Sequence, residues 1–147
     1  MKHATLFADG GSRGNPGPAA SGAVVVADDG TALREIGEFI GVATNNVAEW
    51  HALVVGLGAA LELGIESLDV RLDSELVVRQ FSGVYRVKHP DLIPLHSKAR
   101  ALGRRFARID IQHIPRAENA AADALVNRAL DEAVPRRRGG PPEGGER

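Results

Sequence analysis

The chain has 147 residues, a length typical of one domain with a single sizeable hydrophobic core. It contains no cysteine, which excludes disulfides and thiolate metal sites. Residues 1–20 carry charges, glycines and prolines that do not fit a signal peptide, and no apolar stretch reaches the length of a membrane span. We therefore expect a cytoplasmic protein without a membrane partner, and nothing in the sequence calls for more than a monomer.

The net charge is −1, but the charges are distributed unevenly along the chain. Between Arg79 and Arg116 there are nine Lys or Arg and only two acids, Asp91 and Asp110. A basic surface beside an acidic pocket suits a polyanion whose phosphodiester is handled by metal. The alternative is that these charges form the solvated faces of amphipathic helices.

The first part of the chain predicts three strands followed by a helix. The strands are expected at residues 3–9, 21–27 and 32–42, with a Gly- and Pro-rich loop after the first and a hairpin turn at Asp28-Asp29-Gly30 after the second. Asn45-Asn46 can cap a helix whose apolar residues, from Trp50 to Leu61, follow helical spacing, and Gly64 ends it.

The second part alternates strands and helices. Strands are expected at residues 67–72 and 109–114. Ser74 caps a short helix that ends at Phe81, and a further helix follows Pro90 and Asp91 with apolar residues from Leu92 to Phe106 on one side. The last helix covers residues 118–133. Residues 135–147 are rich in Arg, Gly and Pro and are expected to be a disordered tail to a folded domain of residues 1–134.

The order β-β-β-α-β-α-α-β-α predicts an α/β fold with a mixed five-stranded sheet flanked by helices. Asp9 and Asp73 each follow an apolar strand, and ligands gather at the carboxyl ends of parallel strands. Glu49 and Asp123 fall in the opening turns of two helices. Together these acids indicate one anionic pocket for divalent metal. Singly, each could instead be a turn residue or an acid that complements a helix dipole.

Four short segments carry a resemblance to the ribonuclease H family, type 1, across residues 3–132. They are Asp9-Gly-Gly-Ser-Arg-Gly-Asn-Pro-Gly17, Thr44-Asn-Asn-Val-Ala-Glu49, Leu72-Asp73-Ser74, and Pro115-Arg-Ala-Glu-Asn119 with Ala122-Asp123. The resemblance implies a ribonuclease H-like catalytic domain that cleaves the RNA strand of RNA–DNA hybrids and leaves 5′-phosphate and 3′-hydroxyl ends. It also implies that Asp9, Glu49, Asp73 and Asp123 bind the metal. The chain lacks the basic protrusion that some members insert.

The chemistry of phosphodiester hydrolysis explains why acids are needed at these positions. Two metal ions about 4 Å apart can serve both the attacking water and the leaving 3′ oxygen. Carboxylates suit Mg²⁺, for which Mn²⁺ is a possible substitute, and two ions are expected per site with substrate. Without metal the four carboxylates repel one another, so some should be protonated and metal binding should stabilise the fold.

Substrate contacts are predicted on both sides of these acids. The backbone of the Asp9-Gly-Gly loop can approach a ribose closely, and asparagine amides can reach sugar hydroxyls or base edges. A helix N-terminus attracts the phosphates of a DNA strand, and basic residues between two helices suit salt-sensitive phosphate contacts. The predicted contact residues are Gly10, Gly11, Ser12, Asn15, Thr44, Asn45, Asn46, Gln80, Arg86 and Lys88. Asn15-Pro16 could instead be only a turn, and Asn45 only a helix cap.

The segment before the last acid departs from the family pattern. Many relatives carry a histidine in a longer loop there, where it is thought to assist departure of the leaving group or product. Here the loop is Pro115-Arg116-Ala117 and contains no histidine. Arg116 is the candidate replacement, although an arginine cannot shuttle protons at neutral pH. His113, ten residues before Asp123, is the alternative, and it could equally be a half-buried strand residue.

Three functions are compatible with this sequence. The first is a metal-dependent endoribonuclease specific for RNA–DNA hybrids. The second is a non-catalytic nucleic-acid-binding module on the same fold, which we would expect to lack one of the acids. The third is another metal-dependent nuclease with the same sheet topology.

Overall fold

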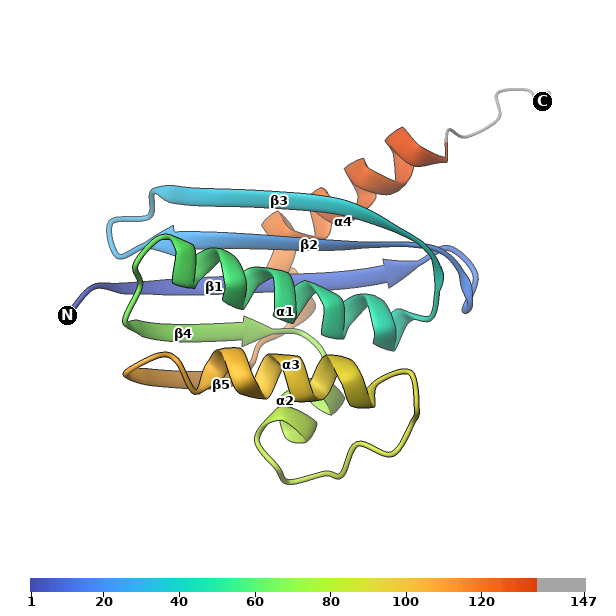
Figure 1. Cartoon of the computed structure of the whole chain (residues 1–147). Helices are drawn as coiled ribbons and strands as arrows, with labels where there is room; N and C mark the ends of the chain where they lie inside the picture. Colours follow the sequence, from blue (N-terminus) through green and yellow to red (C-terminus); the bar gives the residue numbers. More distant parts are fainter. Residues whose placement is uncertain (135–147) are drawn as a thin grey trace.

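The computed structural model describes residues 1–134, and the tail predicted at residues 135–147 lies outside them. The strands are β1 His3–Ser12, β2 Gly17–Ala27, β3 Ala32–Ala43, β4 Ser67–Leu72 and β5 Arg108–His113. The helices are α1 Asn45–Glu62, α2 Glu75–Phe81, α3 Ile93–Gly103, the 3₁₀ helix η1 Arg116–Asn119 and α4 Ala120–Ala133 (Figure 1). Among these residues no helix is long and apolar enough to cross a membrane.

The five strands form one mixed sheet in the order β3-β2-β1-β4-β5. β1 pairs with β2 antiparallel and with β4 parallel, and β4 pairs with β5 parallel. The mixed five-stranded sheet is as predicted, and its first and fourth strands are parallel neighbours. Because the carboxyl ends of parallel strands meet at one edge, Asp9 and Asp73 come to the same edge of the sheet.

Helices cover both faces of the sheet. α1 packs on β1 and β2 and contacts α3, whereas α4 packs on β2, β3 and β1 from behind (Figure 1). Alternate residues of β1, namely Ala4, Leu6 and Ala8, are buried on the α1 side with Trp50 of α1. Trp50, the first of the apolar residues predicted at helical spacing, is completely buried.

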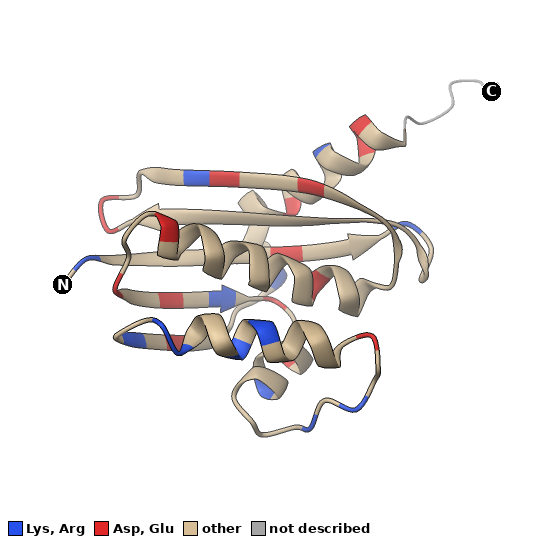
Figure 2. Ribbon diagram, viewed as in Figure 1, with Lys and Arg blue, Asp and Glu red and all other residues tan. Residues whose placement is uncertain are grey.

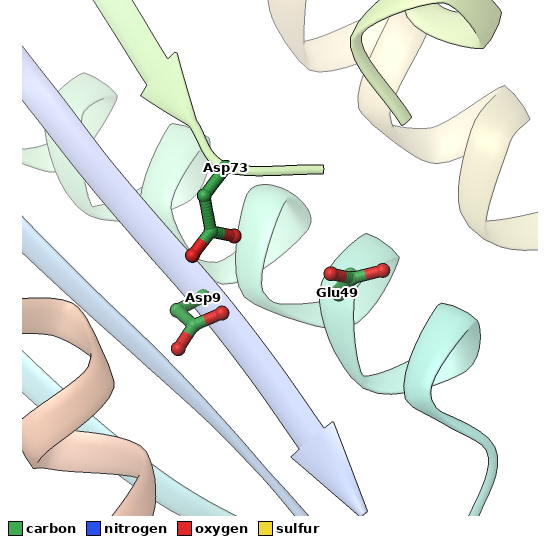
Figure 3. A group of neighbouring side chains, drawn as sticks. All are labelled: Asp9, Glu49 and Asp73. Atoms are coloured by element: carbon green, nitrogen blue, oxygen red, sulfur yellow. The ribbon is translucent and has the colours of Figure 1, made fainter. Parts of the chain in front are cut away.

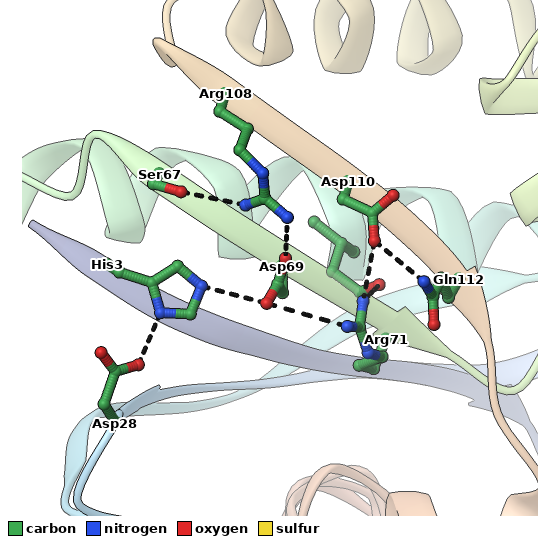
Figure 4. A network of polar contacts seen from close by, with 9 residues as sticks. His3, Asp28, Ser67, Asp69, Arg71, Arg108, Asp110 and Gln112 are labelled. Atoms are coloured by element: carbon green, nitrogen blue, oxygen red, sulfur yellow. Dashed lines mark hydrogen bonds and ion pairs between the residues drawn. The ribbon is translucent and has the colours of Figure 1, made fainter. Parts of the chain in front are cut away.

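The opposite face of β1, β4 and β5 carries a polar network (Figure 4). His3 lies between two carboxylates, with Nδ1 2.5 Å from Asp28 Oδ1 and Nε2 3.0 Å from Asp69 Oδ2. Arg108 Nη2 is 2.8 Å from Asp69 Oδ1. The hydrogen bond with Asp28, joined by that with Asp69, raises the pKa of His3. The network ties the amino ends of the parallel strands and the β2–β3 turn together, far along the strands from the acids at the carboxyl edge.

The first loop is shorter than predicted. Residues 10–21 were expected to be a loop, yet β1 continues to Ser12 and β2 begins at Gly17, with Gly10 paired to Ser21. Glycine and proline usually punctuate strands, but here Gly10 lets β1 lie directly on α1, so packing outweighs local propensity.

Three helix boundaries also differ from the prediction. Thr44, not Asn45 or Asn46, caps α1, because its Oγ1 accepts from Val47 N at 3.2 Å. The helix expected to extend toward Phe106 ends at Gly103, and Phe106 is buried beyond it. The last helix was expected from residue 118, but the chain first makes η1 and enters α4 at Ala120. The cap at Ser74, the end of α2 at Phe81 and the end of α1 before Gly64 are confirmed.

Candidate active site

A close approach of β1 to α1 brings the first two acids together. A Cβ placed on Gly10 would lie 2.2 Å from the carbonyl carbon of Ala48 and 2.4 Å from the backbone nitrogen of Glu49. Only a glycine permits this contact. Since Gly10 follows Asp9 directly, the missing side chain sets Asp9 close to Glu49 of α1. Glu49 lies just past the first turn of α1 and not in its opening turn as predicted.

A second close approach brings in the fourth acid from the other face. Gly22 of β2 is the register partner of Asp9, and a Cβ there would lie 2.4 Å from the carbonyl oxygen of Ala122. Asp123 follows Ala122 in the first turn of α4. Two glycines thus hold helices from opposite faces against the strand position that carries Asp9.

Asp9, Glu49 and Asp73 form a compact group of acids (Figure 3). One carboxylate oxygen from each lies within 4.8 Å of the others. Burial and the nearby charge of Asp73 raise the pKa of Asp9 to about 8, with Asp123 acting in the same direction. Burial and Asp73 raise the pKa of Glu49 to about 7, against the opposing effect of a hydrogen bond with Ser74. Mutual repulsion in a half-buried group is what a cation would relieve.

Asp123 stands beside this group and is held by neighbours of its own. Arg116 Nη2 lies 3.7 Å from Asp123 Oδ1. Asn127, one turn further along α4, donates from Nδ2 to the Asp123 backbone oxygen at 3.1 Å and lies 3.4 Å from Oδ2. The fourth acid therefore faces Asp9 with a cation and an amide on its other sides.

All four acids line one cleft with a volume of about 490 Å³. Its ligand set consists of hard carboxylate oxygens without sulfur or imidazole, which fits Mg²⁺ or Mn²⁺ and does not fit metals that prefer softer ligands. Two cations, Arg13 and Arg116, also line the cleft. Arg13 is anchored by Asp131 of α4, with Nη2 to Oδ1 at 2.6 Å.

A second cleft of about 500 Å³ lies next to the first and shares Asn45 with it. The predicted contact residues divide between the two clefts. Gly10, Gly11 and Ser12 line the first with the acids. The second is lined by Asn15, Thr44, Asn46, Gln80, Arg86 and Lys88, with His89, Val47, Leu76 and Leu92. Lys and Arg residues lie on α3 and on the loop between α2 and α3 (Figure 2).

Two asparagines join the β1–β2 loop to the start of α1. Ser12 N donates to Asn45 Oδ1 at 2.8 Å, and Asn45 N donates to Asn15 Oδ1 at 3.0 Å. Both side-chain oxygens are used by the protein, so the amide NH₂ groups are what these residues can present to a ligand. Gln80 is arranged similarly, because its Oε1 accepts from the buried Trp50 Nε1 at 3.2 Å.

The two candidates for the missing histidine are placed differently. Arg116 is exposed and lines the acidic cleft. His113 is the last residue of β5, is exposed, and is not among the residues lining either cleft. Sequence reasoning did not single out Arg13 or Asn127. For Asn127 a signal existed, since it stands four residues after Asp123 on the same helix face.

Comparison with known proteins identifies close relatives. The profile of a family described as "Reverse transcriptase-like" matches residues 7–129. The chain is 54% identical over 130 residues to "Bifunctional protein Rv2228c" of Mycobacterium tuberculosis, covering 88% of this chain and 36% of that protein. It is 48% identical over 127 residues to "Ribonuclease HI" of Halobacterium salinarum, covering 86% of this chain and 64% of that protein. The chain thus spans about a third of the mycobacterial relative.

Solved structures of related proteins have the same fold. The N-terminal RNase H domain of Rv2228c superposes with a TM-score of 0.88 at 51% identity, covering 90% of this chain and 96% of that one. LC11-RNase H1 in complex with RNA/DNA hybrid, isolated from compost by a metagenomic approach, gives a TM-score of 0.84 at 42% identity, with coverage of 89% and 99%. The five-stranded mixed sheet and its flanking helices are therefore those of known ribonucleases H. The chain belongs to the ribonuclease H family, type 1.

Proposed function

We propose that this protein is an endoribonuclease that hydrolyses the RNA strand of RNA–DNA hybrids and leaves 5′-phosphate and 3′-hydroxyl ends. The observation that carries the proposal is the compact group of Asp9, Glu49 and Asp73, with Asp123 facing Asp9. A non-catalytic module would be expected to lack one of these acids. A relative at 42% identity is known in complex with RNA/DNA hybrid, which supports the same substrate here.

The four acids would hold two divalent ions, Mg²⁺ with Mn²⁺ as a substitute. When bound, such ions supply an activated water and neutralise the charge that develops on the phosphate and the leaving oxygen. The residues of the chain fix the ligand geometry. Asp9 stands between α1, which carries Glu49, and α4, which carries Asp123, and Asp73 follows the neighbouring strand β4.

Arg116 is proposed to contact the scissile phosphate or the product phosphate. It lies beside Asp123 at the rim of the cleft, with an exposed guanidinium that can form paired hydrogen bonds with phosphate oxygens. Because an arginine stays protonated, it would stabilise charge and would not act as a general acid.

The two clefts suggest how the two strands of the hybrid are placed. Gly10, Gly11 and Ser12 border the acids, where a ribose 2′-hydroxyl can meet backbone groups. The second cleft would take phosphates of the DNA strand at Thr44, Gln80, Arg86 and Lys88. Asn45 borders both clefts and would contact the minor groove between the strands. All these residues come from one chain, so we propose that a monomer suffices.

The test is cleavage of a labelled RNA–DNA hybrid in comparison with single-stranded RNA and double-stranded DNA, each with Mg²⁺ or with EDTA. The expected result is cleavage of the RNA strand of the hybrid in Mg²⁺ alone. Asp73→Asn keeps the side-chain shape and removes a charged ligand, so turnover should be abolished while the circular dichroism spectrum is unchanged. Equal cleavage of DNA, or an active Asp73→Asn variant, would refute the proposal.

A further inference from the structure

Asn119 is the most buried polar side chain of residues 1–134, with 1% of its surface exposed. It is the last residue of η1 and the N-cap residue of α4. An asparagine at this position normally turns its Oδ1 toward the first backbone N–H groups of its own helix. Here it makes no such capping hydrogen bond. The side chain points into the protein and leaves the helix start uncapped by it.

The Asn119 amide instead binds the end of β1. Its Nδ2 donates to the backbone oxygen of Ala8 at 2.9 Å. Ala8 and Leu72 form the last register pair between β1 and β4, and β1 then continues beside β2 alone. The Nδ2 donor thus binds β1 at its last pair with β4, beyond which the two parallel strands are no longer paired.

The residues directly after this last β1–β4 pair are two of the acids. Asp9 follows Ala8 directly, and Asp73 follows Leu72. The chain that supplies the amide then enters α4, whose first turn bears Asp123 four residues after Asn119. A single hydrogen bond therefore joins the start of α4, which carries Asp123, to the β1 residue before Asp9. That residue, Ala8, is also the register partner of Leu72, the residue before Asp73.

The oxygen of the Asn119 amide gives an independent indication that this residue has a functional role. Asn119 Oδ1 is buried and has no hydrogen-bond partner, the only such side-chain atom among the described residues. A buried polar atom without a partner lowers stability, and folds normally avoid it. A leucine has nearly the same shape and would remove this cost, but it would leave the Ala8 oxygen without its donor.

We propose that Asn119 is a positioning residue that sets the relative placement of Asp9, Asp73 and Asp123 for metal binding. The inference rests on the proposed two-metal function of these acids, but it concerns their geometry before any substrate binds. Side chains that orient metal ligands in this indirect way typically change metal affinity or activity about 10- to 100-fold when mutated.

The central test is Asn119→Leu, which retains volume and removes the donor. Calorimetric titration of the substrate-free variant with Mg²⁺ should show affinity weakened about 10-fold or more. In hybrid cleavage, kcat at fixed Mg²⁺ should fall and the Mg²⁺ concentration for half-maximal rate should rise, while KM for the hybrid stays within about 2-fold. Asn119→Ser keeps a hydroxyl donor and should fall between Asn119→Leu and the unmodified protein.

Two control variants separate positioning from loss of stability. Ser67→Ala and Leu68→Ala remove a nearly buried hydroxyl and a buried apolar side chain at the amino end of β4, away from the acids. Both should lower the melting temperature without changing Mg²⁺ affinity, measured at a temperature where every variant is folded. If Asn119→Leu loses stability like the controls and binds Mg²⁺ as the unmodified protein does, the proposal is wrong.

A measurement on the unmodified protein covers the case in which Asn119 variants do not fold. The side-chain NH₂ resonances of Asn119 should show a hydrogen protected from exchange, and they should shift during Mg²⁺ titration with the same midpoint as the backbone amide of Gly10. Resonances that do not respond to Mg²⁺ would overturn the proposal. Absence of hybrid cleavage by the unmodified protein, with Mg²⁺ binding intact and sensitive to Asn119, would refute the proposed function and leave the positioning role standing.

Discussion

Three of the four acids of the cleft are brought together by glycines, which carry no side chain. Asp9 reaches Glu49 because Gly10 has no side chain, and it reaches Asp123 because Gly22 has none. Burial, followed by the nearby charge of Asp73, raises the pKa values of Asp9 and Glu49. The positions of the acids around Asp9 therefore depend on two glycines, Gly10 and Gly22, that take no part in the chemistry.

Arg116 gives a prediction at the scale of one residue. Arg116→Ala should lower kcat about 10-fold or more and leave KM nearly unchanged, if the guanidinium beside Asp123 acts on the scissile or product phosphate as proposed and does not anchor the duplex. Arg116→Lys should recover part of the loss, since it keeps the charge but not the paired donors. The measurement is steady-state hybrid cleavage across a range of pH.

The same experiment decides between Arg116 and His113. His113→Ala should leave kcat within about 2-fold, because His113 lies outside the acidic cleft. The shape of the pH–rate profile should also be unchanged in Arg116→Ala, since an arginine does not titrate in this range. A profile that loses a limb near neutral pH in His113→Ala would show instead that the histidine transfers a proton.

At the level of single residues the sequence located the acids but not what holds them. Asp9 and Asp73 could be found because each follows an apolar run, although β1 continues past Asp9. Glu49 and Asp123 could be found because each lies near the start of a helical pattern. The packing role of Gly10 against α1 could not be found, because it depends on two elements meeting in space. The same holds for Asn119, whose partner Ala8 is 111 residues away in the chain.

At the scale of elements, local signals predicted the order of strands and helices more successfully than their ends. Alternating burial in β1 and helical spacing in α1 are repeated patterns, so several residues support each of them. An end depends on one or two residues and on what packs there. Thr44 caps α1, and the Asn45 side chain instead accepts a hydrogen bond from Ser12 N. Threonine and asparagine are both good N-cap residues, so the sequence alone does not show which of the two caps the helix.

The segment between α2 and α3 gives a prediction for an element. Arg86 and Lys88 are exposed in this loop and line the second cleft. Arg86→Ala and Lys88→Ala should each weaken hybrid binding and reduce the slope of log affinity against log salt by about 0.7–0.9 for each phosphate that the variant no longer neutralises. The measurement is hybrid affinity by fluorescence anisotropy at several salt concentrations, in Ca²⁺ or EDTA to prevent cleavage.

A matched control distinguishes direct binding of phosphate from an effect of net charge. Arg34→Ala removes the same charge from β3, where Arg34 pairs with Glu62 at 2.9 Å. It should leave both affinity and salt slope unchanged within error. If Arg34→Ala and Arg86→Ala have equal effects, the loop contributes only to the overall field of the protein and does not touch the substrate.

For the whole molecule, the acidic cleft and the stability of the fold are linked. Strands and helices bring the carboxylates together at one edge of the sheet only when the protein is folded. Their mutual repulsion therefore destabilises the folded state and not the unfolded chain. The order of elements predicted a mixed five-stranded sheet, but it did not give the strand order β3-β2-β1-β4-β5, which depends on long-range pairing. The sequence predicted that the pKa values of some acids would be raised, but not by how much, because the size of the shift depends on burial.

The pH dependence of stability should report this link. The folded-state pKa values of Asp9 and Glu49, about 8 and about 7, exceed the values of about 4 expected in the unfolded chain. Their contribution to stability is therefore present below about pH 4 and is lost as the pH rises toward 8. His3 changes stability in the same direction and Asp69 in the opposite one. Comparison with Asp9→Asn, which cannot ionise at this position, isolates the cleft.

We expect the melting temperature of the metal-free protein, measured relative to Asp9→Asn, to fall between pH 5 and pH 8. Mg²⁺ should reverse this fall, because the ion binds the deprotonated carboxylates and stabilises the folded state by mass action. The Mg²⁺-induced rise in melting temperature should thus be larger at pH 8 than at pH 5, and small in Asp9→Asn. Potassium chloride at matched ionic strength controls for screening. An equal rise with potassium chloride, or a difference between the two proteins that does not vary with pH, would show that the acids are not coupled to folding in this way.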